Sequence, residues 1–176
     1  MKIANKIGAL GIRIGCGDPS KSQNPQDFIK KTAEAFIEIL EKDKSNIDYV
    51  IQNHIDKYLS IDVAKLIKLL GNPRLGLVFS PDNCIVSQEN MNEVFNTVGV
   101  VTKQIYISDL KKINSEYTEV FPGMGDVPLK DSFEAIGGVN FSGWVTFKYG
   151  KVWVDSLEEP KVSLPYFIDN YKEILG

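Results

Sequence analysis

The periodicity of the sequence changes near Gly71-Asn72-Pro73, and this change constrains the fold more than any other feature of the chain. Before it, residues 25–71 place apolar side chains three and four residues apart, which is the spacing of one helix face. After it, residues 74–176 contain short apolar or β-branched segments separated by turns rich in Gly, Pro, Asn and Asp. A helical first part followed by a mixed second part predicts an α+β protein.

Three helices are predicted in the first part. The first begins at Pro25 after the capping residue Asn24, the second covers roughly residues 47–59, and the third begins at the capping residue Ser60 and ends at Gly71. Their apolar stripes are Phe28, Ile29, Ala33, Phe36, Ile37 and Leu40 in the first, Ile47, Val50, Ile51, Ile55 and Tyr58 in the second, and Ile61, Ala64, Ile67 and Leu70 in the third.

The second part is predicted to hold short strands at 75–79, 84–86 and 100–107, short helices after Ser87, after Ser108 and at 129–136, a hairpin from Val139 to Ser156, and a last helix capped by Ser163. We therefore expect an N-terminal unit of about three helices packed on a small, mostly antiparallel sheet, with the C-terminal hairpin followed by a helix. Residues 1–176 would form a single α+β domain, with a helical part at about 25–71 and a mixed part at about 74–176.

The charge and the cysteine content narrow the class of protein. The net charge is −3 and the isoelectric point is about 5.3, without the basic stripe of a nucleic-acid binder. No stretch approaches the roughly 20 apolar residues that span a bilayer. The two cysteines, Cys16 and Cys84, are too few for a disulfide framework. These features predict a soluble, acidic, cytoplasmic protein that binds neither nucleic acid nor a membrane.

Candidate catalytic residues are few. A thiol or hydroxyl nucleophile needs a base, and His54 is the single histidine; it falls on the apolar stripe of its predicted helix, which favours a core role. If the protein is an enzyme, the candidate catalytic residues are Cys16, His54 and Asp18. Cys16 lies between two glycines in a loop, whereas Cys84 is expected to be buried and inert. The carboxylate pairs Glu158-Glu159 and Asp126 with Asp131 are further candidates for acid–base chemistry.

The loop at residues 15–22 resembles a phosphate-binding loop only in part. It has glycines before Lys21 and Ser22, but Ser20 stands before the lysine and Pro19 removes a backbone N–H. The oxygen-bearing side chains of this loop also lack the full pattern of a calcium site. We therefore expect no cofactor and no metal.

Two features favour binding. The loop at residues 121–128 contains Phe121, Met124 and Asp126 between glycines that let a ligand approach the backbone. In the predicted hairpin, Trp144 and Trp153 share one face and form a binding patch if that face is open. Because the last helix follows directly in the sequence, we expect it to cover this face.

The leading functional hypothesis is a non-catalytic protein- or ligand-binding module of adaptor, immunity or chaperone type. Its partner would be another protein or a small ligand. The alternative is a small hydrolase or transferase that uses Cys16 or a carboxylate. A weaker alternative is phosphate or nucleotide binding through the 15–22 loop.

Overall fold

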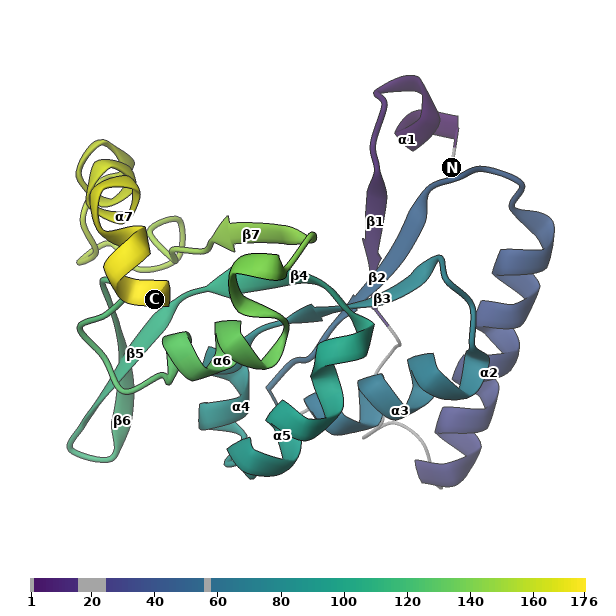
Figure 1. Cartoon of the computed structure of the whole chain (residues 1–176), viewed down its shortest axis with the longest axis horizontal. Helices are drawn as coiled ribbons and strands as arrows, with labels where there is room; N and C mark the ends of the chain where they lie inside the picture. Colours follow the sequence, from purple (N-terminus) through teal and green to yellow (C-terminus); the bar gives the residue numbers. More distant parts are fainter. Residues whose placement is uncertain (1, 16–24, 56–57) are drawn as a thin grey trace.

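A sheet of five parallel strands forms the centre of the molecule (Figure 1), in a computed structural model that describes residues 2–15, 25–55 and 58–176. The strands lie in the order β1-β2-β3-β4-β7. Each strand pairs with the next strand of this sheet along the chain, so every connection crosses over outside the sheet. The strands are β1 (Gly11–Ile14), β2 (Asp48–Gln52), β3 (Leu75–Phe79), β4 (Thr102–Ile107) and β7 (Trp144–Phe147).

Helices supply these crossovers. Figure 1 shows α2, α3, α5 and α6 on one side of the sheet, whereas α1 and α7 stand on the other side, toward its opposite ends. The helical segments are α1 (Lys2–Lys6), α2 (Pro25–Lys42), α3 (Ser60–Leu70), α4 (Pro81–Val86), α5 (Met91–Val98), η2 (Gly99–Val101), α6 (Leu129–Ala135), η3 (Gly138–Asn140) and α7 (Pro160–Leu175).

The core lies between the sheet and these helices. Strand β3 is buried at all five positions, as is typical of a central strand in a parallel sheet. Each apolar side chain that is fully buried stabilises the fold by about 1.5–3 kcal/mol. The core side chains of the central strands and the facing helices are Leu77, Phe79, Ile105, Ile107, Val63, Ala64, Ile67, Val94 and Val98.

A two-stranded antiparallel hairpin stands apart from the main sheet. It is formed by β5 (Asp109–Ile113) and β6 (Glu116–Val120), which follow β4 directly. The turn residues Asn114 and Ser115 have φ angles of 49° and 74°, the positive values that two-residue hairpin turns require. This hairpin carries the chain past the end of β4 before α6 returns it to the sheet.

The predicted fold class is wrong, because the main sheet is entirely parallel rather than mostly antiparallel. The predicted helix at 47–59 is wrong as well, since β2 occupies its first part. Residues 47, 50, 51, 55 and 58 do have helical spacing, but a short apolar run around Ile51 fits a buried strand equally well. Only pairing with β1 and β3 decides between the two.

The predicted C-terminal hairpin is also wrong. Residues 144–147 do form a strand, but β7 pairs in parallel with β4, and residues 151–153 form a turn rather than a second strand. The alternating pattern on both sides of Tyr149-Gly150 satisfied the hairpin rule, which does not consider a distant partner strand. Residues 84–86 lie in α4 and Leu110 lies in β5, so the predicted strand and helix there are incorrect.

Other local predictions are confirmed. Strands occupy 75–79 and 102–107, and a helix begins at Pro25. Helix α3 ends before Gly71, whose φ of 57° is the left-handed conformation of a helix stop, but Ser60 is its first residue rather than its cap, which is Leu59. Asn24, the predicted cap, lies outside the described residues. Within the described part of the chain, none of the helices has the length and apolar character that crossing a membrane requires.

Candidate active site

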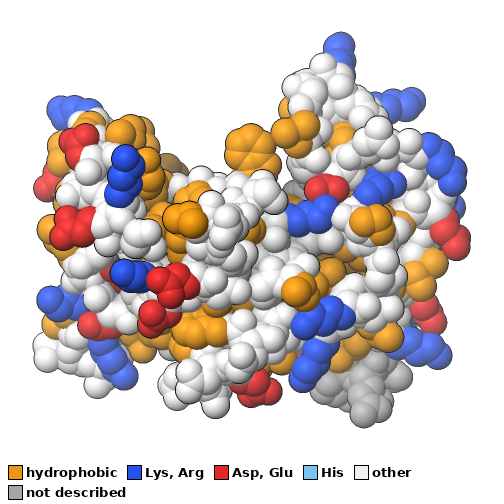
Figure 2. Space-filling view, in the orientation of Figure 1, with side chains coloured by type: hydrophobic (Ala, Val, Ile, Leu, Met, Phe, Trp, Pro, Cys, Tyr) orange, Lys and Arg blue, Asp and Glu red, His pale blue; other side chains and the backbone are white. Residues whose placement is uncertain are grey.

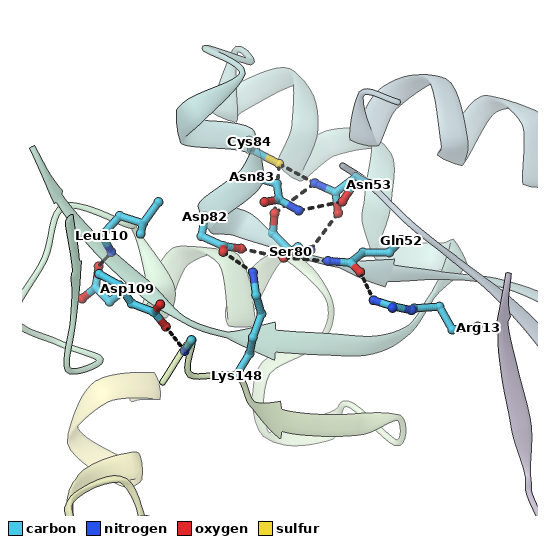
Figure 3. Close-up of polar contacts among 12 residues, drawn as sticks. Arg13, Gln52, Asn53, Ser80, Asp82, Asn83, Cys84, Asp109, Leu110 and Lys148 are labelled. Carbon is cyan, nitrogen blue, oxygen red and sulfur yellow. Dashed lines mark hydrogen bonds and ion pairs between the residues drawn. The ribbon is translucent and has the colours of Figure 1, made fainter. Parts of the chain in front are cut away.

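Polar residues stand at the carboxyl ends of the parallel strands, which meet at one edge of the sheet (Figure 3). Gln52 ends β2, Ser80 follows β3, and Lys148 follows β7. In parallel α/β proteins, ligands bind at this edge because the loops that follow the strands are free to vary without disturbing the core. These side chains are therefore the candidates for a ligand-binding site.

A chain of hydrogen bonds crosses this edge from β1 to β7 (Figure 3). Arg13 donates to the side-chain oxygen of Gln52, whose Nε2 donates to Ser80 Oγ over 3.4 Å. Ser80 Oγ donates to Asp82 Oδ1 at 2.6 Å, and Lys148 Nζ donates to Asp82 Oδ2, also at 2.6 Å. We call these five side chains the edge network. They come from distant parts of the sequence and orient one another.

Two buried asparagines fix the turn that follows β3. Asn53 accepts a hydrogen bond from the backbone N–H of Ser80 at 2.8 Å and donates to the carbonyl oxygen of Ser80 at 2.9 Å. Asn83 donates to the carbonyl oxygen of Asn53 at 2.8 Å. Because both asparagines are almost inaccessible to water, these bonds hold Ser80 and Asp82 in place.

Lys148 and Asp82 form an ion pair at the edge network. The side chain of Asp82 is 5% exposed, whereas that of Lys148 is 35% exposed. A buried carboxylate is costly unless its oxygens are paired, and here Lys148 and Ser80 pair both of them. Burial also raises the pKa of Glu119 on β6, against the opposing effects of the Gly150 backbone N–H and the positive charge of Lys148.

A hollow of about 860 Å³ adjoins the edge network at Arg13. Its lining includes Arg13, Val50, Gln104 and Trp144, and much of the rest lies at the amino-terminal ends of β1, β2, β4 and β7. Figure 2 shows the molecular surface indented between the parts of the molecule that carry α1 and α7. Among the described residues, the hollow thus meets the edge network at Arg13 alone and extends from there toward the amino-terminal ends of the strands.

The arrangement of strands and helices matches a known family. A family model described as xylose isomerase-like TIM barrel matches residues 1–163. The chain belongs to the xylose isomerase-like TIM barrel family. A comparison with curated proteins gives no match. In TIM barrels the active site lies at the carboxyl ends of the strands, which is where the edge network lies.

Solved structures of low sequence identity share this fold. A xylose isomerase domain protein from Planctomyces limnophilus is 17% identical with a TM-score of 0.70, over 98% of this chain and 60% of that one. The IOLI protein, solved with a zinc atom, is 14% identical with a TM-score of 0.73, over 98% and 64%. D-psicose 3-epimerase from Clostridium cellulolyticum H10, solved with D-tagatose, is 14% identical with a TM-score of 0.67, over 93% and 64%. The chain thus spans 60–64% of the length of these structures.

Membership of the xylose isomerase-like TIM barrel family corrects the functional hypothesis. The prediction of a non-catalytic adaptor, immunity or chaperone-like module is wrong, because this is a family of sugar isomerases, epimerases and related enzymes. The prediction relied on the lack of a visible nucleophile and base in the sequence. The edge network contains neither cysteine nor histidine, and its members become neighbours only when the strands pair.

The described residues of this family member do not fit a zinc ion. Zinc is held by cysteine sulfur, histidine nitrogen and carboxylate oxygen. Across residues 2–15, 25–55 and 58–176, no three side chains of His, Cys, Asp or Glu gather in a way that could hold a metal ion. At the edge network, both oxygens of Asp82 already accept hydrogen bonds, and one of the donors is the ammonium group of Lys148.

The predicted catalytic residues are not brought together in the part that the structure describes. Cys16 and Asp18 lie outside the described residues, as does most of the 15–22 loop. His54 does not lie on a helix; it follows β2, is exposed, and its Nδ1 lies 3.0 Å from the carbonyl oxygen of Ile55. Cys84 is buried as expected, although it lies in α4.

The 121–128 loop is held by a buried carboxylate. Asp109, which is 1% exposed, accepts hydrogen bonds from the backbone N–H groups of Gly123, Gly125 and Val127 at 2.8–3.1 Å. The ring of Phe121 stacks on those of Tyr166 and Tyr149, with centroids 4.5 Å and 5.7 Å apart. Asp126 accepts a hydrogen bond from the backbone N–H of Lys112, and Met124 is 54% exposed. Phe121 and Asp126 thus make internal contacts, whereas Met124 faces water.

The two tryptophans do not form a covered pair. Trp144 is 62% exposed at the start of β7, and Trp153 is 82% exposed in the turn at 151–153. The expectation that the last helix covers them is therefore wrong. Helix α7 instead packs through Phe167, which stacks on Phe147 with centroids 4.8 Å apart. Trp144 lines the hollow at the amino-terminal end of β7, away from Lys148 and the edge network.

The sequence did hold a signal for the residues that were missed. Gln52-Asn53 directly follows the apolar run of β2, and Ser80 and Asp82 directly follow the run of β3. Polar residues after buried parallel strands are typical of a ligand-binding edge. The signal was lost because residues 47–59 were assigned to a helix and Lys148 to a hairpin.

Proposed function

We propose that this chain carries the substrate-binding edge of an enzyme that acts on a sugar or a similar polyhydroxy compound. The observation that carries the proposal is the edge network, which places the amide of Gln52 and the cations Arg13 and Lys148 along the carboxyl edge of the sheet, with a hollow next to Arg13. Sugar hydroxyl and carbonyl oxygens are recognised by such groups through convergent hydrogen bonds. Family membership supports an isomerase or epimerase type of reaction.

The structural neighbours support the substrate class. D-psicose 3-epimerase was solved with D-tagatose, a ketohexose, and shares the fold of this chain. Its identity of 14% supports the fold alone, so the sugar class for this chain also depends on the chemistry of the edge network. Since the chain spans 60–64% of such structures, the activity of the whole protein is part of the proposal.

We also propose that the protein works in the cytoplasm and that its partner is a small polar molecule rather than nucleic acid. The buried thiol of Cys84 is compatible with a reducing compartment. The net charge of −3 argues against binding to a phosphate backbone.

Ligand-observed NMR tests the proposal. The chain would be mixed with D-tagatose, D-psicose, D-fructose and D-xylose, first to detect saturation transfer and then, in D2O, to detect exchange of carbon-bound hydrogen. We expect saturation transfer to at least one sugar, which Gln52→Leu weakens and Asn92→Leu on the exposed side of α5 does not. A protein that stays folded and gives neither transfer nor exchange with any of these sugars would contradict the proposal.

A further inference from the structure

The edge network places the ammonium group of Lys148 beside its only carboxylate, Asp82. We propose that the Lys148 ammonium group is the fixed cation of this site, that it donates hydrogen bonds to a substrate oxygen, and that substrate binding needs no divalent cation. The inference deepens the proposed function and depends on it. The contrast with the IOLI protein, which was solved with zinc, makes the inference specific to this chain.

The backbone and the side chain of Lys148 are both anchored. Its backbone N–H donates to the carbonyl oxygen of Ile107 at 2.9 Å, which continues the β4–β7 ladder by one residue. Its Nζ reaches Asp82, which is held in turn by Ser80. A lysine that is fixed at both ends loses less conformational entropy when it binds a ligand than a mobile surface lysine does.

The ammonium group keeps donors available for a ligand. Lysine has three N–H donors, and the bond to Asp82 Oδ2 uses one of them. The side chain is 35% exposed, so a small molecule at the edge of the sheet reaches Nζ from the solvent side. A hydrogen bond from a charged donor contributes about 1.5–3 kcal/mol, more than a bond between neutral groups.

The same contacts occupy the oxygens of the edge network that could bind a divalent cation. Asp82 receives two donors, and the side-chain oxygen of Gln52 receives the guanidinium of Arg13. A divalent ion bound to these oxygens would have to displace Lys148 and Arg13 or lie beside their positive charges. Like charges at such distances repel strongly in a partly buried site.

The first experiment measures sugar affinity by calorimetry, with EDTA and again with Zn²⁺ or Mn²⁺. We expect the same dissociation constant in both conditions and a loss of about tenfold or more in Lys148→Met, the equivalent of one charged hydrogen bond. Lys148→Arg should restore part of the affinity because it keeps the charge. Lys65→Met, at an exposed position on α3, is the matched control and should bind like the wild type.

A double variant separates substrate contact from folding. Lys148→Met alone leaves the buried Asp82 without its cation, which destabilises the site. In the double variant Asp82→Asn with Lys148→Met, no buried charge is left, so we expect it to fold and still to lose the affinity. Wild-type affinity in this folded double variant would overturn the inference.

The second experiment titrates Zn²⁺ alone into the wild type and into Asp82→Asn. Zinc binding that requires Asp82, or sugar binding that appears only with a metal and disappears with EDTA, would overturn the inference and leave the proposed function intact. The absence of any sugar binding, with or without metal, would instead contradict the proposed function and the substrate contact that rests on it. The two failures are therefore distinguishable.

Discussion

Replacing Asp109 with asparagine tests how strongly one carboxylate holds the loop at residues 121–128. Asp109 Oδ2 accepts from the backbone N–H groups of Gly123 and Gly125, and Oδ1 accepts from those of Leu110 and Val127. An asparagine side chain has one oxygen and one NH₂ group, so in either orientation two of the four N–H groups face a donor instead of an acceptor.

The magnitude follows from these two lost bonds. A buried donor without an acceptor costs about 1–3 kcal/mol, which gives about 2–6 kcal/mol for two. Because part of the loop is exposed and water can reach its glycines, we expect the lower part of this range, about 2–4 kcal/mol. This is a large fraction of the free energy of unfolding of a typical domain.

Urea denaturation followed by circular dichroism measures the effect, and hydrogen exchange locates it. The backbone N–H groups of Gly123, Gly125 and Val127 should lose protection in Asp109→Asn. Asp126→Asn is the matched control, because Asp126 is exposed and, within the described residues, its side chain accepts one hydrogen bond, from the backbone N–H of Lys112. Ordinary surface substitutions change the free energy of unfolding by up to about 0.5 kcal/mol, and a change no larger than this in Asp109→Asn would refute the reasoning.

Three further predictions follow from burial and charge. Burial alone would raise the pKa of Asp43, but hydrogen bonds from Ser45, Arg74 and Tyr49 outweigh it and lower the pKa from 3.8 to about 2. The lowered pKa means that the ionised Asp43 carboxylate stabilises the folded protein; this contribution should be complete above about pH 4 and be lost as the pH falls toward 2. Between these pH values, the free energy of unfolding should depend less on pH in Asp43→Asn than in the wild type. Burial raises the pKa of the Cys84 thiol, so alkylation should proceed only as fast as the protein opens; rapid labelling under native conditions would contradict this. Leu77→Ala should cost about 2–5 kcal/mol by urea denaturation, against little change for the exposed Leu69→Ala.

Local patterns predicted those elements that depend on neighbours in the chain. The end of helix α3 was predicted because Gly71 acts within one turn of the helix itself, whereas Ser60, the expected cap, is the first helical residue and donates its hydroxyl to Glu89. Strand β3 was predicted because four apolar residues and one glycine form an uninterrupted run that ends at Ser80-Pro81. These signals require no knowledge of the rest of the molecule.

The candidate site could be predicted only as separate polar residues. The predicted strands at 75–79 and 84–86 leave only a short connection at residues 80–83, whereas α4 begins at Pro81 and Asp82 pairs with Lys148, 66 positions along the chain. His54 and the tryptophans attracted attention because their side chains are chemically distinctive. Amides and hydroxyls are common on any surface, so their role is visible only where several of them converge.

The sequence by itself determined where chain segments are apolar and where turns break them, because those properties act over a few residues. The tertiary structure alone decided that the strands run parallel, since the apolar run around Ile51 is compatible with a helix until β1 and β3 pair with β2 on either side. The same pairing brings Arg13, Gln52, Ser80 and Lys148 to one edge of the sheet. Strand direction and register are properties of the whole sheet, and the chemistry of this site is set by them.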